Sequence, residues 1–227
     1  MKVLGIITAI GGSKGIKRKN IVSLAGKPLI YYTIQAAKKS KLLTNFIVST
    51  EDKKIAAIAK KYGASVPFLR PKKLAKDDTK SIDVIKNIIK KLEKNNEFYD
   101  AVIILQPTSP LRTGIDIDNA INKMIKTDAD SIISLVNITG FALDWIKKIK
   151  NDIIYSFYKD EKEGIPRQKL DTLYKRNGAI YLTKTSVLKK GSIFGKSSRP
   201  YIMPAEKSVD INEEFDLLLT KFLMEKK

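Results

Sequence analysis

The chain has 227 residues, 43% of them hydrophobic, and carries a formal net charge of +19. That length suffices for one sizeable core, and its apolar runs are far shorter than the roughly 20 residues that span a bilayer. Cysteine and histidine are absent from the sequence, which excludes disulfides, thiolate nucleophiles, Cys/His zinc sites and a histidine base. A strand-like segment begins at the N-terminus without a charged leader, so we expect a cytoplasmic protein without membrane contact.

Hydrophobic periodicity and turn residues predict the elements. In chain order they are a strand at Val3–Thr8, a helix beginning at Pro28, a strand at Asn45–Thr50, a helix at Asp52–Tyr62 capped by Gly63, a short strand at Ser65–Phe68, a helix at Ser81–Lys94, a strand at Ala101–Leu105, a helix at Ile115–Lys126, strands at Ser131–Val136 and Asn177–Leu182, and a closing helix at Glu213–Met224. Strands that alternate with helices indicate βαβ units, and hence an α/β fold whose mostly parallel sheet has helices on both faces.

The alternation weakens between residues 140 and 175, where Trp145, Tyr155, Phe157 and Tyr158 stand among charged residues. We expect one domain spanning residues 1–227, with this segment as an inserted antiparallel or irregular excursion. Its aromatic residues form either a small core or a surface for a partner.

The excess of lysine admits two interpretations. A basic surface attracts nucleic acid or phosphorylated ligands, whereas dispersed lysines are typical of solvated helix faces. Lys-Lys pairs recur from Lys38-Lys39 to Lys189-Lys190 without clustering. We therefore expect no nucleic-acid partner. A nucleic-acid binder remains the remote alternative, and it would bind RNA or DNA with a steep salt dependence.

Two polar segments follow predicted strands, at residues 9–20 and 106–112. Ligands of open parallel sheets bind outside the carboxyl ends of the strands. The first segment fails the G-x-G-x-x-G pattern at Ile10, and the "GKS" at Gly195–Ser197 fails the Walker A pattern at Lys190. Neither a standard dinucleotide domain nor a P-loop NTPase is indicated.

The sequence "GGSKGIKRKN", Gly11–Asn20, has the features of a phosphate cradle. Gly11, Gly12 and Gly15 allow backbone N–H groups to turn inward, and the cations supply countercharge. The alternative is an exposed lysine-rich turn, which its position after the first strand of a βαβ unit disfavours.

Two further segments contain candidate ligand-binding or metal-binding side chains. "LQPTSPLR", Leu105–Arg112, combines an amide, hydroxyls and a guanidinium on a loop stiffened by prolines, a set that suits a polyhydroxylated or carboxylated ligand. Its alternative is a rigid crossover with helix caps. "SVDINEEFD", Ser208–Asp216, places Asp210 at the end of an apparent strand, where it would either hold Mg²⁺ near a triphosphate or cap the last helix. The residues alone leave both roles open.

Segments spread over nearly the whole chain resemble, in one order, the acylneuraminate cytidylyltransferase family, the CMP–sialic acid synthetases. They are "GGSKGIKRKN", "LAGKPLI" at Leu24–Ile30, "IVSTED" at Ile47–Asp52, "PFLRP" at Pro67–Pro71, "DDTKSIDVI" at Asp77–Ile85, "LQPTSPLRT" at Leu105–Thr113, "PRQ" at Pro166–Gln168, "NGAIYL" at Asn177–Leu182 and "VDI" at Val209–Ile211.

The resemblance implies a Rossmann-like nucleotidyltransferase fold and the conversion of CTP and a nine-carbon 2-keto sugar acid into the CMP-sugar and pyrophosphate. It also implies Mg²⁺ and a homodimer whose excursion crosses onto the partner. Lys19 and Asp210 are its implied catalytic residues. The implied nucleotide-binding residues are Gly11, Gly12, Ser13, Lys14, Gly15, Arg18, Lys19, Asn20, Arg70 and Ser81. The implied sugar-binding residues are Gln106, Thr108, Ser109, Arg112, Arg167, Tyr181 and Phe194. The implied metal ligands are Asp210 and, weakly, Asn212.

The chain departs from the family pattern at three places. Thr8-Ala9-Ile10 stands where Pro-Ala-Arg is usual, and an uncompensated loss of that arginine costs about 1.5–3 kcal/mol of triphosphate binding. Asn212 replaces a frequent second acid, and Lys175-Arg176 replaces an arginine-proline pair.

These departures leave two hypotheses, an active enzyme in which Lys14, Lys17 or Arg18 compensates, or a drifted homologue that binds ligand with weak turnover. We favour activity, because the rest of the nucleotide and sugar loops is intact. An eight-carbon keto sugar acid is the alternative substrate. The sequence does not choose among legionaminic, pseudaminic and sialic acids.

Overall fold

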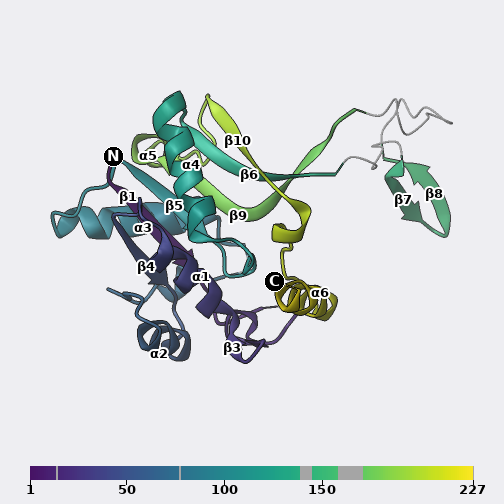
Figure 1. Ribbon diagram of the computed structural model, residues 1–227, viewed down its shortest axis with the longest axis horizontal. Coiled ribbons are helices and arrows are strands. Elements are labelled where there is room, and N and C mark those ends of the chain that lie inside the picture. The colour runs from purple at the N-terminus through teal and green to yellow at the C-terminus, as the bar shows by residue number, and fades with distance from the viewer. Residues whose placement is uncertain (14, 77, 139–144, 158–170, 227) are drawn as a thin grey trace.

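The computed structural model describes residues 1–13, 15–76, 78–138, 145–157 and 171–226 (Figure 1). A six-stranded sheet with the order β10-β6-β9-β5-β1-β4 forms its centre. The strands are β1 (Val3–Thr8), β4 (Asn45–Ser49), β5 (Ala101–Leu105), β6 (Ser131–Asn137), β9 (Tyr174–Lys184) and β10 (Ser198–Met203). β1 pairs in parallel with β4 and β5, and β6 with β10, whereas β9 runs antiparallel to β5 and β6. The predicted α/β class with a mostly parallel sheet is confirmed.

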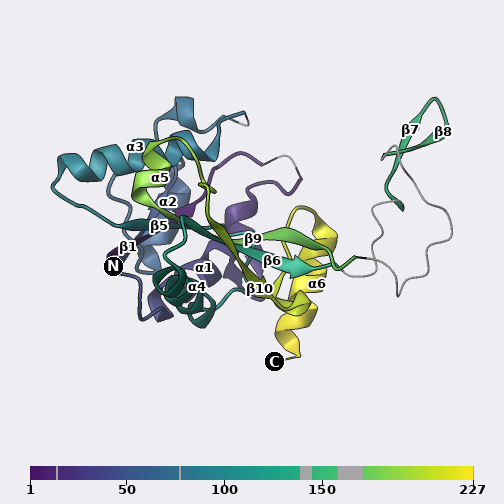
Figure 2. The ribbon, with the colours of Figure 1, turned by 90° about the horizontal axis from the view of Figure 1, so that it is seen from above.

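Helices cover both faces of the sheet (Figures 1 and 2). The helices α1 (Leu29–Lys39), α2 (Lys53–Lys61) and α4 (Gly114–Thr127) contribute apolar side chains to one buried cluster. The helices α3 (Ser81–Lys94) and α5 (Thr185–Lys189) contribute to a second cluster on the opposite face. All residues of β5 are buried because both of its faces are covered, as its uninterrupted apolar sequence predicted.

Local signals placed most of these elements correctly. Asp52 is the N-cap of α2, and its carboxylate accepts the N–H groups of Lys54 and Ile55 at 2.7 and 3.0 Å. Gly63 follows the helix with a φ of +85°, which favours glycine. The strand predicted at Ser65–Phe68 is wrong, because only Ser65 makes a bridge, to Ile47 of β4. Pro67 lacks the N–H that would continue the pairing.

The last part of the chain lies against the loop that follows β1. The helix α6 (Glu214–Glu225) and Ile211 share a small apolar cluster with Ile16, Leu24 and Leu29. The prediction that Asp210 ends a strand is wrong. The strand of this region is β10, and a short 3-10 helix, η5 (Ala205–Lys207), separates it from the irregular segment that carries Asp210.

In the part of the chain that is described, two short hairpins and two further 3-10 helices lie outside the central sheet. The strands β2 (Ser23–Leu24) and β3 (Lys27–Pro28) form a short hairpin, and 3-10 helices lie at η1 (Lys19–Ile21) and η2 (Lys72–Leu74). Within the predicted excursion, β7 (Lys147–Lys150) and β8 (Ile153–Ser156) form an antiparallel hairpin. It stands apart from the sheet in both views (Figures 1 and 2). Tyr158 lies outside the described residues. Among the helices that are described, none has the length and apolar character to cross a bilayer.

Candidate nucleotide-binding site

A cavity of about 390 Å³ lies beyond the carboxyl ends of β1 and β5. It brings together residues from the loop after β1, the segment before α3, the loop after β5 and the segment before α6. Its lining residues are Thr8, Ile10, Gly12, Ser13, Lys19, Asn20, Arg70, Leu74, Lys76, Thr79, Ser81, Val84, Gln106, Pro107, Thr108, Asp210 and Asn212. Both polar segments singled out in the sequence therefore meet at one edge of the sheet.

The glycine loop is held in its conformation by hydrogen bonds of its own Ser13 side chain and by close contact with the backbone of Asn212. The Ser13 hydroxyl accepts the N–H of Lys19 at 3.1 Å and donates to the carbonyl oxygen of Ile16. A Cβ atom on Gly15 would lie 2.4 Å from the backbone oxygen of Asn212, so only glycine fits there. The N–H of Gly11 is already bonded to Glu51 at 2.7 Å. Gly11 and Gly15 thus shape the loop, while Gly12 and Ser13 line the cavity.

The described cations of the cavity are Lys19, Arg70 and Lys76. Arg18 is not among the lining residues, because its guanidinium nitrogen Nη2 lies 2.7 Å from Asp52 Oδ2 in an ion pair. Its expected place in the nucleotide site stays a prediction, and Lys14 lies outside the described residues. In the described structure the Arg18 guanidinium is paired with Asp52, while Ile10 lines the cavity.

Arg70 and Asn20 are buried at the cavity wall. The guanidinium of Arg70 donates to the hydroxyl and carbonyl oxygens of Ser49 at 3.1 and 2.8 Å. Burial lowers the pKa of Arg70, and the nearby carboxylate of Glu51 opposes that shift. The amide of Asn20 donates to the carbonyl oxygen of Ile10 at 2.7 Å. The Arg70 bonds hold the segment before η2 against the end of β4, and the Asn20 bond ties the loop after β1 to itself.

Asp210 carries the feature most indicative of a ligand. Its Oδ1 is buried without a hydrogen-bond partner among the described residues. The amide nitrogen of Asn212 lies 3.3 Å from Asp210 Oδ2, and the amide oxygen of Asn212 accepts from Lys19 Nζ at 3.2 Å. One unpartnered carboxylate oxygen beside a cavity suits Mg²⁺, which takes few protein ligands and shares the rest with phosphates and water. In the described part of the chain, no cluster of three acidic residues forms a metal cage.

The loop after β5 divides into residues that reach the cavity and residues that do not. Gln106 and Thr108 line it. Ser109 is buried, and its hydroxyl donates to the carbonyl oxygen of Asn177 at 3.4 Å. Arg112 is 2% exposed, and it donates to the carbonyl oxygen of Ala179 and the hydroxyl of Thr33, both at 2.8 Å.

Ser109 and Arg112 are not among the lining residues, and their expected contact with the sugar stays a prediction. In the structure both hold the loop against β9. Burial lowers the pKa of Arg112 to about 9, against a smaller opposing effect of Asp116, so its guanidinium stays protonated at neutral pH.

Tyr181 and Phe194 are not among the residues that line the cavity. Burial raises the pKa of Tyr181, the charge of Arg176 lowers it, and the charge of Asp210 raises it. The guanidinium carbon of Arg176 also lies 5.4 Å from the centre of the Phe194 ring. Their predicted role in a sugar pocket stays a prediction, and Arg167 lies outside the described residues.

Sequence reasoning missed Lys76 and Thr79, which the structure brings to the cavity wall. Lys76 lies between the matched motifs "PFLRP" and "DDTKSIDVI", and Thr79 lies within the second motif. Their position in or beside these motifs was the signal in the sequence that could have identified them. No charged partner of Lys76 is found among the residues described.

A protein-family model described as "Cytidylyltransferase" matches residues 4–221. The chain is 34% identical, over 99% of its length and 97% of the relative, to a CMP-N,N'-diacetyllegionaminic acid synthase of Legionella pneumophila. It is 35% identical, over 98% of its length and 96% of the relative, to a pseudaminic acid cytidylyltransferase of Campylobacter jejuni. An N-acylneuraminate cytidylyltransferase of Escherichia coli is 33% identical, and there the chain spans 53% of the relative.

Among solved structures, a CMP:2-keto-3-deoxy-manno-octonic acid synthetase complexed with CTP matches with a TM-score of 0.75. The alignment covers 100% of this chain and 99% of the other, at 17% identity. That likeness concerns the fold alone.

Proposed function

We propose, from the premise that this chain belongs to the cytidylyltransferase family, that it is a nucleotidyltransferase that activates a nine-carbon 2-keto sugar acid with CTP. The products would be the CMP-sugar and pyrophosphate. The observation that carries the proposal is the cavity itself, where a glycine loop and a polar proline-stiffened loop meet Asp210. Relatives named for legionaminic, pseudaminic and N-acylneuraminic acids, at 33–35% identity, support the nine-carbon class.

The reaction joins the anomeric hydroxyl oxygen of the sugar acid to the α-phosphorus of CTP, and the bond to pyrophosphate breaks. Such a transfer depends mainly on positioning and on neutralising charge, which suits a chain without histidine. Lys19, Arg70 and Lys76 supply positive charge at the cavity, and the N–H groups around Gly12 and Ser13 suit phosphate oxygens. Gln106 and Thr108 offer an amide and a hydroxyl to the sugar acid.

A divalent cation, Mg²⁺ or a substitute, belongs to this proposal. Such a cation would supply neutralising charge for the phosphate oxygens. Asp210 would hold it through the buried, unpartnered Oδ1. Asn212 is a weaker candidate, because its amide oxygen already accepts a hydrogen bond from Lys19.

The proposed assembly is a homodimer in the cytoplasm. The β7–β8 hairpin exposes Ile149, Ile153, Ile154 and Tyr155 by 75%, 55%, 68% and 47%. An isolated two-stranded hairpin is at best marginally stable in water, so a second copy that covers these side chains would stabilise it.

The test is to incubate purified protein with CTP, Mg²⁺ and a panel of legionaminic, pseudaminic, sialic and eight-carbon keto sugar acids, and to measure pyrophosphate release. Release with at least one nine-carbon acid is expected. Release with the eight-carbon acid alone would correct the substrate class. Absence of release from a protein shown to be folded would favour the drifted homologue that Ile10 suggests.

A further inference from the structure

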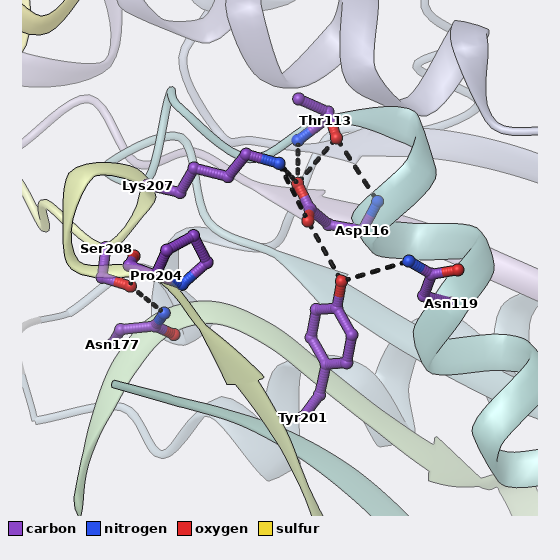
Figure 3. Close-up of polar contacts among 8 residues, drawn as sticks. All are labelled: Thr113, Asp116, Asn119, Asn177, Tyr201, Pro204, Lys207 and Ser208. Atoms are coloured by element: carbon purple, nitrogen blue, oxygen red, sulfur yellow. Dashed lines mark hydrogen bonds and ion pairs between the residues drawn. The ribbon is translucent and has the colours of Figure 1, made fainter. Parts of the chain in front are cut away.

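A buried polar cluster joins the start of α4 to the segment that leads to Asp210 (Figure 3). Asp116, which is 3% exposed, accepts from the backbone N–H and hydroxyl of Thr113 at 2.8 and 2.6 Å. The hydroxyl of Tyr201 donates to Asp116 Oδ1 at 3.1 Å. The ammonium of Lys207 lies 3.3 and 3.4 Å from the two carboxylate oxygens. The carboxylate therefore holds both β10 and η5 against α4.

Asp116 remains ionised in this cluster. Burial raises its pKa, but the hydrogen bonds from Thr113, the charge of Lys207 and the hydrogen bond from Tyr201 together outweigh burial and lower it. A buried carboxylate that loses its cationic partner is left uncompensated, which is costly. The ion pair between Asp116 and Lys207 therefore fixes the position of η5, which follows β10, against α4.

A second set of hydrogen bonds holds the same segment at Ser208, shortly before Asp210. The amide of Asn177 on β9 donates to the Ser208 hydroxyl at 2.9 Å, and that hydroxyl donates to the carbonyl oxygen of Pro204 at 2.8 Å (Figure 3). The adjacent Gly178 has a φ of +76°, and a Cβ on it would lie 3.6 Å from Asp210 Cγ. Asp210 thus lies against the same part of β9, at Asn177 and Gly178, that holds Ser208.

Beyond Asp210 the segment is tied to both loops of the cavity. The N–H of Ile211 donates to the carbonyl oxygen of Thr108 at 2.8 Å, and the carbonyl oxygen of Ile211 accepts from Lys19 at 2.9 Å. Asp210 consequently lies between two anchored stretches, with Oδ1 unpartnered among the described residues.

We propose that Asp116 and Lys207, together with the Asn177–Ser208 hydrogen bond, are positioning residues that aim the Asp210 carboxylate into the cavity. The inference rests on the proposed function, because it assigns Asp210 a ligand there. None of these residues lines the cavity except Asp210. They would act on the Asp210 carboxylate indirectly, by fixing the path of the backbone that carries it.

The experiment measures Mn²⁺ binding by titration calorimetry to folded protein saturated with CTP, without sugar acid, so that no turnover occurs. Lys207→Met removes the charge and keeps most of the stem. We expect it to weaken Mn²⁺ binding by about 10-fold to 100-fold, as residues that orient metal ligands do. Lys207→Arg, which keeps the charge, should recover most of the affinity.

Lys184→Met is the matched control. Lys184 also pairs with an aspartate, Asp128, at 2.6 Å, and its side chain is 26% exposed against 28% for Lys207. It lies opposite Ala101, at the far end of β9 from the cavity. We expect its Mn²⁺ affinity to equal that of the wild type. If Lys207→Met does not fold, Ser208→Ala tests the same segment with both charges in place and should weaken binding in the same direction.

Mn²⁺ affinity unchanged in folded Lys207→Met or Ser208→Ala would overturn the positioning role, as would an equal loss in Lys184→Met. Wild-type protein that binds Mn²⁺ with CTP but releases no pyrophosphate with any acid would overturn the proposed function alone. In that case a selective loss in Lys207→Met still supports the positioning role. Wild-type protein that binds no Mn²⁺ in the presence of CTP would overturn the positioning role.

Discussion

The ammonium of Lys19 donates a hydrogen bond of 2.9 Å to the backbone carbonyl oxygen of Ile211, a residue 192 positions later in the chain. The same ammonium lies 3.2 Å from the amide oxygen of Asn212. This contact joins the loop after β1 to the segment before α6. The two implied catalytic residues, Lys19 and Asp210, both line the cavity.

Asp210→Ala should abolish pyrophosphate release while leaving the unfolding midpoint nearly unchanged. Asp210 Oδ1 has no hydrogen-bond partner in the described structure, and Oδ2 accepts one exposed hydrogen bond, from Asn212 at 3.3 Å, so the change removes little structural bonding. The paired measurements are turnover with saturating CTP and Mg²⁺ and thermal unfolding without ligand. A large drop in stability with residual turnover would instead support a capping role.

Lys76→Met should raise the CTP KM by about tenfold, because one hydrogen bond to a charged group contributes roughly 1.5 kcal/mol or more. Lys76 lines the cavity, and no ion pair engages it among the described residues. Lys72→Met, an exposed change in η2 outside the cavity lining, is the control for general charge. Equal effects of the two changes would contradict a specific role for Lys76.

Ile10→Arg should lower the CTP KM several-fold, since a guanidinium beside the triphosphate adds charge-assisted hydrogen bonds. Ile10 lines the cavity, whereas Arg18 is paired with Asp52. Ile125→Arg adds the same charge at a side chain that is 55% exposed outside the cavity, and it should leave the KM unchanged. An unchanged KM in Ile10→Arg would mean that the existing lysines already compensate.

Arg112→Met should lower the free energy of unfolding by about 3 kcal/mol, because buried acceptors lose a charged donor. Those acceptors include the carbonyl oxygen of Ala179, at 2.8 Å. Urea denaturation measures the loss, and Arg199→Met on exposed β10 is the control. The KM for the sugar acid should stay within about twofold in the folded fraction, since such an effect is under 0.5 kcal/mol. A selective rise in that KM would restore the sugar-binding role predicted from the sequence.

Ile149→Glu combined with Ile154→Glu should yield a monomer in light scattering, whereas the wild type should be a dimer. Both side chains are more than half exposed on the β7–β8 hairpin, at 75% and 68%. A carboxylate buried at an apolar interface costs several kcal/mol. Ile125→Glu on α4 is the matched control. A wild type that is already monomeric would remove the hairpin from consideration as an interface.

Local patterns in the sequence were sufficient for most of the fold. Short apolar runs typical of buried strands located β1 and β5, and the helical spacing of apolar residues located α3, because both signals arise within a few residues. They did not reveal that β9 runs antiparallel between β5 and β6, since strand direction depends on pairing with distant segments. The segment that carries Asp210 likewise looked like a strand but is irregular.

The sequence by itself determined most of the elements, the glycine loop and the meeting of two polar loops at one edge of the sheet, but it did not predict β10 or α5. Only the tertiary structure decided which charged side chains reach the cavity. Arg18, Arg70 and Arg112 are all candidates for ligand binding in the sequence, but only Arg70 lines the cavity. Arg18 is paired with Asp52, and the buried guanidinium of Arg112 donates to the carbonyl oxygen of Ala179. The direction of a long side chain follows from where its partners lie, and these partners are 34 and 67 positions away. Such placements are set by folding of the whole chain, which no local pattern records.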